Sequence, residues 1–253
     1  LFCSDRCIYC YFGRMVACNV GMVSMEVWKK GRFSHYRFET IINKRGFYMI
    51  TLYSGTPGAG KSLHLASRLY HWMQFRNAPI IGNFSCDFSS IKKPKGHFLN
   101  IDNSDLTPER LLWFSKNYSE YVGRKVKEGE ILLVIDEAQL LFNSREWVKT
   151  DRAEWCAFFT QHRKLGYEVV LIAQFDRMLD RQIRSLIEYE WIHRKVSNFG
   201  AQGKILSLFC GGKLFVAVKV WYPLKEKVGS EFFFYRKKFS DIYDTYALFS
   251  IPK

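Results

Sequence analysis

The sequence lacks any uninterrupted apolar run of the length that crosses a membrane, about 18 uncharged residues. The nearest candidate, residues 205–224, is broken by Gly211-Gly212 and by Lys213 and Lys219. Cysteines and charges occupy the amino terminus where a secretory signal would place an apolar stretch. Internal repeats and low-complexity tracts are also missing. These absences argue against a membrane-spanning helix and an export signal within these residues.

Negative charge is scarce as well, because 24 Asp and Glu face 38 Lys and Arg, giving a formal net charge of +14. Such an excess favours an anionic partner: a nucleotide, a nucleic acid or the inner face of a membrane. A solvated basic surface with no partner is the plain alternative. Hydrophobic residues make up 48% of the chain. This is enough for a buried core, and 253 residues suit one α/β domain with an appendage.

Four of the seven cysteines fall in the first eighteen residues. The spacing of Cys3, Cys7 and Cys10 resembles the iron–sulfur loop of radical S-adenosylmethionine enzymes. Such a loop needs a barrel after it, whereas the sequence that follows points to a different nucleotide-binding fold. The remaining cysteines are isolated and are expected to be small buried hydrophobic residues without disulfides. They are Cys86, Cys156 and Cys210.

Met49 is the expected natural start, although the sequence begins at Leu1. Residues 1–48 would then be upstream read-through, a fusion remnant or an irregular extension. We expect the core domain over residues 49–200 and a β-rich extension of the same domain over residues 201–253.

From Met49 the pattern alternates between strands and helices. Strands are predicted at 49–54, 79–84, 131–135 and 168–173, and helices at 61–77, 107–118, 151–165 and 177–189. This alternation predicts an α/β fold, a P-loop NTPase with a mostly parallel sheet flanked by helices. Towards the carboxyl terminus, residues 205–210 and 213–221 around Gly211-Gly212 predict a β-hairpin, and 231–239 a further strand.

A complete phosphate-binding pattern, Gly-x-x-x-x-Gly-Lys-Ser, lies between the first strand and the first helix. Its glycines let backbone N–H groups turn towards phosphate oxygens, and the helix amino terminus adds its dipole. Lys61 is expected to reach the β- and γ-phosphates, and the Ser62 hydroxyl to bind Mg²⁺. The residues predicted to bind ATP are Gly55, Thr56, Pro57, Gly58, Ala59, Gly60, Lys61, Ser62 and Leu63.

Polar residues follow two buried strands. Asp136 ends the aliphatic strand 131–135, where a carboxylate can hold Mg²⁺, and Glu137 is placed to polarise the attacking water. Gln174 follows the strand 168–173 and could orient that water if the two strands are neighbours. The plain alternative is that these residues only end their strands. We predict Lys61, Glu137 and Gln174 as catalytic, and Ser62 and Asp136 as the Mg²⁺ ligands.

An arginine acting on a neighbouring subunit would complete such a site. The candidates are Arg145, Arg163, Arg181 and Arg184. No metal-ligand spacing surrounds His162 or His193, which are expected to be structural.

Several segments in this order resemble the zonular occludens toxin-like family, which includes the filamentous-phage assembly ATPase. They are Gly55–His64, Val134–Gln139, Gln161–Gly166 with Ile172–Gln174, Ile183–Ile187, Tyr235–Lys238 and Tyr243–Tyr246. The resemblance covers roughly Met49 to Phe249.

The resemblance implies an ATP-hydrolysing motor domain at the cytoplasmic face of the bacterial host inner membrane. It would power extrusion of single-stranded phage DNA as a homo-oligomer, together with phage assembly and coat proteins. Family members usually continue into a transmembrane helix, and Arg236-Lys237-Lys238 would suit a site near an anionic leaflet. Two alternatives share the same residues: a DNA-translocating or packaging ring ATPase, and a scaffold that binds nucleotide without hydrolysing it.

Overall fold

The computed structural model describes residues 49–143 and 149–243. The chain separates into two units, Leu1–Gly46 and Phe47–Lys253, and the described residues all lie in the second. The expected extension 1–48, with Cys3, Cys7 and Cys10, lies outside the described residues.

An eight-stranded sheet forms the centre of the described unit, with the strand order β3-β2-β4-β5-β1-β6-β7-β8. Neighbouring strands from β3 to β6 are parallel, and β7 and β8 are antiparallel additions at one edge. In chain order the strands are β1 (Ile50–Ser54), β2 (Pro79–Gly82), β3 (His97–Asn100), β4 (Ile131–Ile135), β5 (Tyr167–Ile172), β6 (Tyr189–Lys195), β7 (Leu214–Trp221) and β8 (Glu226–Phe234).

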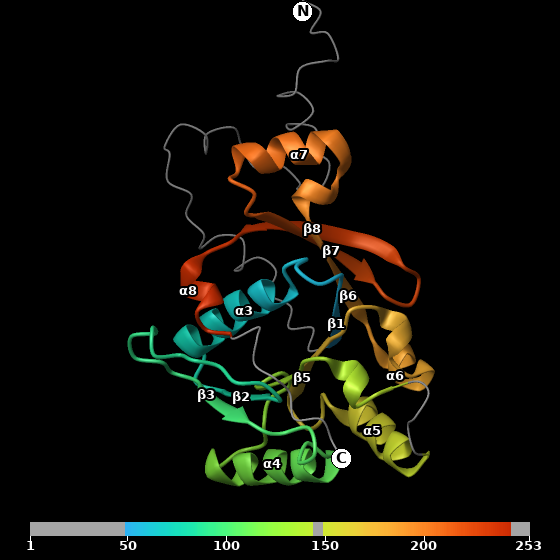
Figure 1. Cartoon of the computed structure of the whole chain (residues 1–253). Coiled ribbons are helices and arrows are strands. Elements are labelled where there is room, and N and C mark those ends of the chain that lie inside the picture. The colour runs from blue at the N-terminus through green and yellow to red at the C-terminus, as the bar shows by residue number, and fades with distance from the viewer. Residues whose placement is uncertain (1–48, 144–148, 244–253) are drawn as a thin grey trace, which may run out of the picture. The chain divides into compact units, whose positions relative to one another are not determined.

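Helices cover both faces of this sheet, as Figure 1 shows. The α-helices are α3 (Lys61–Phe75), α4 (Pro108–Tyr121), α5 (Lys149–Gln161), α6 (Arg181–Leu186), α7 (Gly200–Phe209) and α8 (Lys237–Ser240). Short 3₁₀ turns are η2 (Ala138–Leu140), η3 (Asp176–Met178) and η4 (Val196–Asn198). None of the helices within 49–143 and 149–243 has the length and apolarity needed to span a bilayer.

The five aliphatic residues of β4 are all fully buried because successive side chains of a strand point to opposite faces and both faces are covered. Leu133 belongs to the core beneath α4, α5 and α6, together with Phe159 of α5. Leu132 and Val134 belong to the core beneath α3, together with Leu69. The strand that leads to Asp136 is therefore fixed from both sides.

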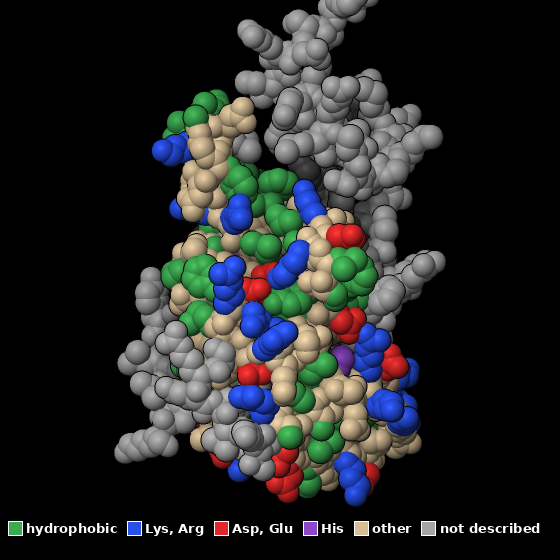
Figure 2. Space-filling view, turned by 90° about the vertical axis from the view of Figure 1, so that its right-hand side faces the viewer, with side chains coloured by type: hydrophobic (Ala, Val, Ile, Leu, Met, Phe, Trp, Pro, Cys, Tyr) green, Lys and Arg blue, Asp and Glu red, His purple; other side chains and the backbone are tan. Residues whose placement is uncertain are grey.

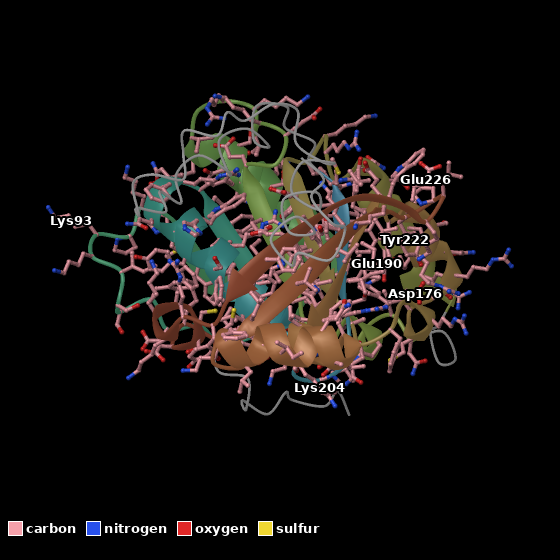
Figure 3. The ribbon with its side chains drawn as sticks, turned by 90° about the horizontal axis from the view of Figure 1, so that it is seen from above. Lys93, Asp176, Glu190, Lys204, Tyr222 and Glu226 are labelled. Atoms are coloured by element: carbon pink, nitrogen blue, oxygen red, sulfur yellow. The ribbon has the colours of Figure 1, made fainter. Side chains whose placement is uncertain are left out.

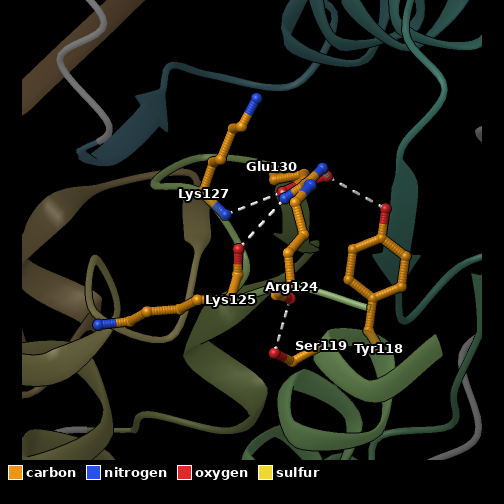
Figure 4. A network of polar contacts seen from close by, with 6 residues as sticks. All are labelled: Tyr118, Ser119, Arg124, Lys125, Lys127 and Glu130. Carbon is orange, nitrogen blue, oxygen red and sulfur yellow. Dashed lines mark hydrogen bonds and ion pairs between the residues drawn. The ribbon is translucent and has the colours of Figure 1, made fainter. Parts of the chain in front are cut away.

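The start of β4 is held by a polar network in the preceding loop (Figure 4). The Arg124 guanidinium donates two hydrogen bonds to the Glu130 carboxylate, at 2.9 and 2.7 Å. Glu130 also accepts from the Lys127 N–H at 2.8 Å, and the Ser119 hydroxyl donates to the Arg124 carbonyl at 2.9 Å. These contacts pin the loop directly before the buried strand.

The predicted elements up to residue 173 agree with the structure, apart from β3, which was not expected. The predicted helix 177–189 was wrong in extent, because only 181–186 is α-helical and Tyr189 already begins β6. The two buried positions of β6 are both polar, Glu190 and His193. The strand therefore shows no apolar alternation in the sequence.

The predicted first arm of the hairpin at 205–210 was also wrong, since residues 200–209 form α7. Gly203 allows the helix to approach η4 closely, because a Cβ atom there would lie 2.3 Å from the Val196 carbonyl oxygen. The hairpin consists instead of β7 and β8. The strand expected at 231–239 is β8, which ends at Phe234 before α8.

Candidate nucleotide-binding site

The strand order brings the predicted site residues to one edge of the sheet. β5 lies between β1 and β4 and is parallel to both. The residues after these three strands, Gly55, Gln174 and Asp136, therefore meet at the carboxyl ends of the strands, where open α/β sheets bind ligands. The Gly55 N–H donates to the Gln174 carbonyl at 3.1 Å, so the loop after β1 is joined directly to the end of β5. The prediction for Gln174 assumed that its strand lies next to the strand of Asp136, and β5 and β4 are neighbours.

Two glycines of the loop have both a backbone conformation and a close contact that exclude a side chain. Gly55 has φ 142°, and a Cβ atom there would lie 2.6 Å from the His193 carbonyl oxygen. Gly60 has φ 96°, and a Cβ atom there would lie 2.8 Å from a ring carbon of Phe215. L-residues with side chains rarely adopt such positive φ values. The loop therefore lies directly against His193 of β6 and Phe215 of β7, and only glycine permits contacts this close.

The amino terminus of α3 suits an anion. Its N-cap is Gly60, which supplies no side-chain hydrogen bond, and its first turn has no acidic residue. The first N–H groups of a helix carry a partial positive charge and need acceptors from outside the helix. The residues present at Lys61, Ser62 and Leu63 thus fit the triphosphate of a nucleotide.

Lys61 lies within this loop, where its Nζ atom donates to the Gly55 carbonyl at 2.5 Å and to the Thr56 carbonyl at 3.4 Å. Burial lowers the pKa of its ammonium group, and the nearby carboxylates of Glu137 and Asp136 counteract that shift. The ammonium group therefore interacts electrostatically with both predicted acids, although they lie more than seventy residues away in the sequence.

Asp136 is buried and held by the loop after β2. Its N–H donates to Asn83 Oδ1 at 2.7 Å, and Asn83 Nδ2 donates to the Asp136 carbonyl at 2.8 Å. Asn83 Nδ2 also donates to Asn103 Oδ1 at 2.7 Å. This pair of reciprocal bonds fixes the backbone at the point where the carboxylate leaves β4. Burial raises the pKa of this carboxyl group.

Both carboxylate oxygens of Asp136 accept a hydrogen bond. The Glu137 N–H donates to Oδ1 at 2.8 Å, and the Tyr243 hydroxyl donates to Oδ2. Tyr243 is itself buried beside Phe84, with ring centroids 5.0 Å apart. These bonds oppose the effect of burial on the pKa of Asp136 and favour its charged form. A charged, oriented carboxylate fits the ligand set that Mg²⁺ requires.

Glu137 has a left-handed backbone conformation, with φ 45° and ψ 48°. Such strain in a residue other than glycine is uncommon and concentrates at functional sites. Its carboxylate accepts a hydrogen bond from Gln139 Nε2 on the following 3₁₀ turn. The left-handed turn thus ends β4 and sets the direction in which the Glu137 side chain leaves the strand.

Two histidines lie beneath the loop. His64 Nδ1 and His193 Nε2 are 2.8 Å apart, and His193 Nδ1 donates to the Ser54 carbonyl at 3.1 Å. The His193 proton must therefore be on Nδ1, and His64 is the donor to Nε2. Burial is the main reason that the pKa of His193 falls to about 4 and that of His64 lies well below its usual value. The expected structural role of His193 agrees with these contacts.

The turn between β7 and β8 is tied to the residue before the loop through Glu190, which is labelled in Figure 3 with Asp176 and Tyr222. The Ser54 hydroxyl donates to Glu190 Oε1 at 2.6 Å, and Lys225 Nζ donates to Glu190 Oε2 at 3.0 Å. Lys225 also reaches Asp176 Oδ2 at 3.2 Å, where the Tyr222 hydroxyl donates at 3.0 Å. The carboxyl-terminal hairpin therefore supports both the start of the loop and the segment after Gln174.

The arginine candidates are distributed differently. Arg145 lies outside the described residues. Arg163 pairs with Glu188 at 2.5 Å, next to the amino ends of β5 and β6 and thus at the edge opposite to the loop. Arg181 is exposed at the start of α6, and Arg184 lies on the same helix. An arginine able to reach a neighbouring subunit stays a prediction.

Sequence reasoning missed Asn83 and Tyr243. Asn83 directly follows β2, the neighbour of the strand that leads to Asp136, but the predicted strand ran to residue 84 and placed Asn83 inside it. Tyr243 had no local signal, because its contact joins residues 107 positions apart.

The chain is similar to a known protein family and to individual phage proteins. Residues 49–247 match the family model described as zonular occludens toxin (Zot). The Gene 1 protein of Enterobacteria phage I2-2 is 35% identical over 86 residues, which are 33% of this chain and 24% of that protein. The Gene 1 protein of Enterobacteria phage M13 is 33% identical over 86 residues, 33% of this chain and 25% of that protein. The matched stretch thus spans about a quarter of the length of these curated relatives.

Among solved structures, that of an ATPase domain from another protein matches with a TM-score of 0.52 at 7% sequence identity. The match covers 78% of this chain and 84% of that one. This likeness concerns the fold, that of a P-loop ATPase domain. The N-terminal domain of zonular occludens toxin from Neisseria meningitidis has a TM-score of 0.48 at 18% identity, covering 78% and 98%. The genome packaging NTPase B204 of Sulfolobus turreted icosahedral virus 2, solved with ATP-gammaS, has a TM-score of 0.44 at 15% identity. This match covers 73% of this chain and 95% of that one.

Proposed function

The chain belongs to the zonular occludens toxin (Zot) family, and from this premise we propose that it is an ATP-hydrolysing motor domain. Its work would be the assembly of a filamentous phage and the extrusion of the phage, with its single-stranded DNA, through the host inner membrane. The observation that carries the proposal is that the loop after β1, Gln174 after β5 and Asp136 after β4 lie at the carboxyl ends of three neighbouring parallel strands.

In this proposal the loop 55–62 holds the triphosphate through its N–H groups and the first turn of α3. The Lys61 ammonium group exchanges its bonds to the Gly55 and Thr56 carbonyls for phosphate oxygens. The Ser62 hydroxyl and the Asp136 carboxylate would hold Mg²⁺. When bound, Mg²⁺ neutralises charge on the β- and γ-phosphate oxygens.

Hydrolysis needs a group that accepts a proton from the attacking water. Glu137 is proposed for this role, and Gln174, at the end of the strand between the loop and Asp136, is proposed to orient the same water. A scaffold that only binds nucleotide would not need an acid at position 137. The proposal therefore favours turnover over binding alone.

The assembly role rests on family membership and on the short match to phage Gene 1 proteins. It implies a homo-oligomer at the cytoplasmic face of the inner membrane, with phage assembly and coat proteins as partners and an arginine supplied from a neighbouring subunit. Contact with single-stranded DNA agrees with the net charge of +14.

The test uses phosphate release by the purified chain and virion release from infected cells. The variant Lys61→Ala is expected to lose ATP turnover, and a phage carrying it is expected to release no virions while single-stranded DNA accumulates in the cell. Lys116→Ala, at an exposed position on α4, is the matched control. Turnover retained in Lys61→Ala would contradict the ATPase. If Lys61→Ala lost ATP turnover without any effect on virion release, the proposed ATPase activity would stand and the proposed assembly role would be contradicted.

A further inference from the structure

Helix α7 presents its small residues to the rest of the domain. Gly203 and Ser207, one turn apart, are buried, and Ser207 is only 3% exposed. A Cβ atom at Gly203 would lie 2.3 Å from the Val196 carbonyl oxygen and 2.7 Å from the Phe199 Cβ atom. The helix thus approaches η4 closely at Gly203, and the two described buried residues of α7, Gly203 and Ser207, offer little apolar surface.

Three large apolar residues of the helix are exposed. Ile205 is 57% exposed, Leu208 81% and Phe209 85%. The spacing of three and four positions places them on neighbouring parts of one helix face. A surface helix of a globular protein normally turns its apolar face to the core and its polar face to water. Ile205, Leu208 and Phe209 instead form an exposed apolar face, and such a face marks an interaction site.

Positive charge surrounds this face. Residues 191–221 contain no Asp or Glu. Arg194 and Lys195 precede the helix, Lys204 lies on it (Figure 3), and Lys213 follows it. Arg194, Lys204 and Lys213 are exposed. The segment that carries the apolar face is therefore basic, with exposed cations before, on and after the helix and no acid from residue 191 to residue 221.

Edge strand β8 adds apolar side chains on the same side of the sheet. Phe232 and Phe234 are 58% and 50% exposed. They pair with Val216 and Leu214, which pack against Val196 of η4. Figure 2 shows hydrophobic side chains gathered on the upper part of one face of the molecule, with Lys and Arg side chains spaced around them. We call Ile205, Leu208, Phe209 and these two phenylalanines the α7 surface.

We propose that the α7 surface binds an anionic phospholipid bilayer. Its apolar side chains enter the boundary between headgroups and acyl chains, and Arg194, Lys204 and Lys213 contact lipid phosphates. Nucleic acid is a poorer occupant, because bases would stack on the three phenylalanines only, whereas the acyl boundary also buries the aliphatic Ile205 and Leu208. A second copy related by two-fold symmetry is also poorer, because it would oppose Arg194, Lys204 and Lys213 to the same three cations.

This inference goes beyond the proposed function by naming a partner surface, and it does not depend on nucleotide chemistry. The full chain is mixed with vesicles of equal parts phosphatidylglycerol and phosphatidylcholine, or of phosphatidylcholine alone, and sedimented. We expect binding to the anionic vesicles. The double variant Leu208→Ser with Phe209→Ser is expected to bind about tenfold more weakly or worse. Lys204→Gln with Lys213→Gln is expected to weaken binding and reduce its salt dependence.

The matched control is Leu112→Ser with Trp113→Ser, which removes two exposed apolar side chains from α4. It is expected to bind vesicles like the wild type. All variants are expected to keep wild-type ATP turnover in solution, so failure of vesicle binding and failure of the ATPase are distinguishable.

Three results would overturn the proposal. The wild-type chain could stay in the supernatant with anionic vesicles at low salt, or the Leu208/Phe209 variant could sediment like the wild type. The third is that this variant changes the oligomeric state by light scattering without lipid, or loses binding to a single-stranded oligonucleotide. That result would assign the surface to a second copy or to nucleic acid instead.

Discussion

The hydroxyl of Tyr243 donates its hydrogen bond to the carboxylate of Asp136, so a residue from the carboxyl-terminal segment completes the surroundings of the proposed Mg²⁺ ligand. The backbone of the same segment is anchored nearby, since the Asp87 N–H donates to the Ile242 carbonyl at 2.9 Å. Phe239, four residues earlier, packs against Tyr70 of α3 at 5.4 Å between ring centroids. The segment thus joins α3, the loop after β2 and the end of β4.

Removing this hydroxyl by Tyr243→Phe should destabilise the domain. The change leaves a buried carboxylate oxygen without its donor, which costs about 1–3 kcal/mol in the free energy of unfolding. Urea unfolding measures the loss. Tyr235→Phe, whose hydroxyl lies exposed next to the Ser240 hydroxyl, is the matched control and should change stability little.

The same variant should also shift the acid limb of the ATPase pH profile. The Tyr243 hydrogen bond lowers the pKa of Asp136 against the effect of burial. Without it the carboxylate takes up a proton at a higher pH, so activity should begin to fall at a higher pH than in the wild type. An unchanged acid limb would separate Tyr243 from the charge state of Asp136.

Glu137→Gln should separate nucleotide binding from hydrolysis. The amide keeps the size of the side chain but cannot accept a proton from water, so turnover should fall by about 10²–10⁴-fold. Binding of a fluorescent ATP analogue should persist. The control is Glu128→Gln at an exposed position before β4. Wild-type turnover in Glu137→Gln would remove Glu137 from the proposed mechanism.

Gly60→Ala should impair nucleotide binding and stability for two reasons. The left-handed backbone costs about 1–2 kcal/mol with any side chain, and the new methyl group would meet the Phe215 ring at 2.8 Å. Gly123→Ala has φ 66° and open space around the Cβ position, so it isolates the backbone cost. Adding Phe215→Ala should recover part of the loss in Gly60→Ala, as a double-mutant cycle of urea unfolding would measure.

Acid should destabilise the fold through His193. Its pKa is about 4 in the folded protein against 6.5 in the unfolded chain. As the pH falls the unfolded chain takes up the proton first, so the free energy of unfolding decreases from about pH 6.5 down to about pH 4. The loss at pH 5 should be about 2 kcal/mol from this group.

His193→Asn removes the titrating group, and its unfolding curve should depend less on pH in this window. His71→Asn on α3 is the control. Equal pH dependence of the wild type and His193→Asn would show that other groups govern the acid response.

Much of the core and of the site could be predicted because its signals are local. Five consecutive aliphatic residues identified β4, and the acids directly after it identified the end of that strand. The loop 55–62 carries its own conformational requirements in its glycines. Polar residues at the ends of neighbouring parallel strands necessarily meet at one edge, so Gln174 could also be placed.

The rest depends on contacts that the local pattern does not encode. β6 was missed because Glu190 and His193 are buried by their bonds to Ser54 and Lys225, and not by apolar character. The short apolar run 205–209 is ambiguous between strand and helix without its surroundings. Its helical state reflects the close approach of Gly203 to η4, which becomes visible only in three dimensions.

The position of β1 inside the sheet has a consequence for biosynthesis. Ile50 is paired with Val169 on one side, and Thr51 with Tyr189 on the other. Both neighbours of the strand that carries the phosphate loop are therefore made long after it, and such non-local pairing is slow to form. During synthesis on the ribosome, β1 and its loop emerge first and lack their flanking strands until β5 and β6 have emerged. The nucleotide site, although encoded near the beginning of the domain, is thus completed late in its synthesis.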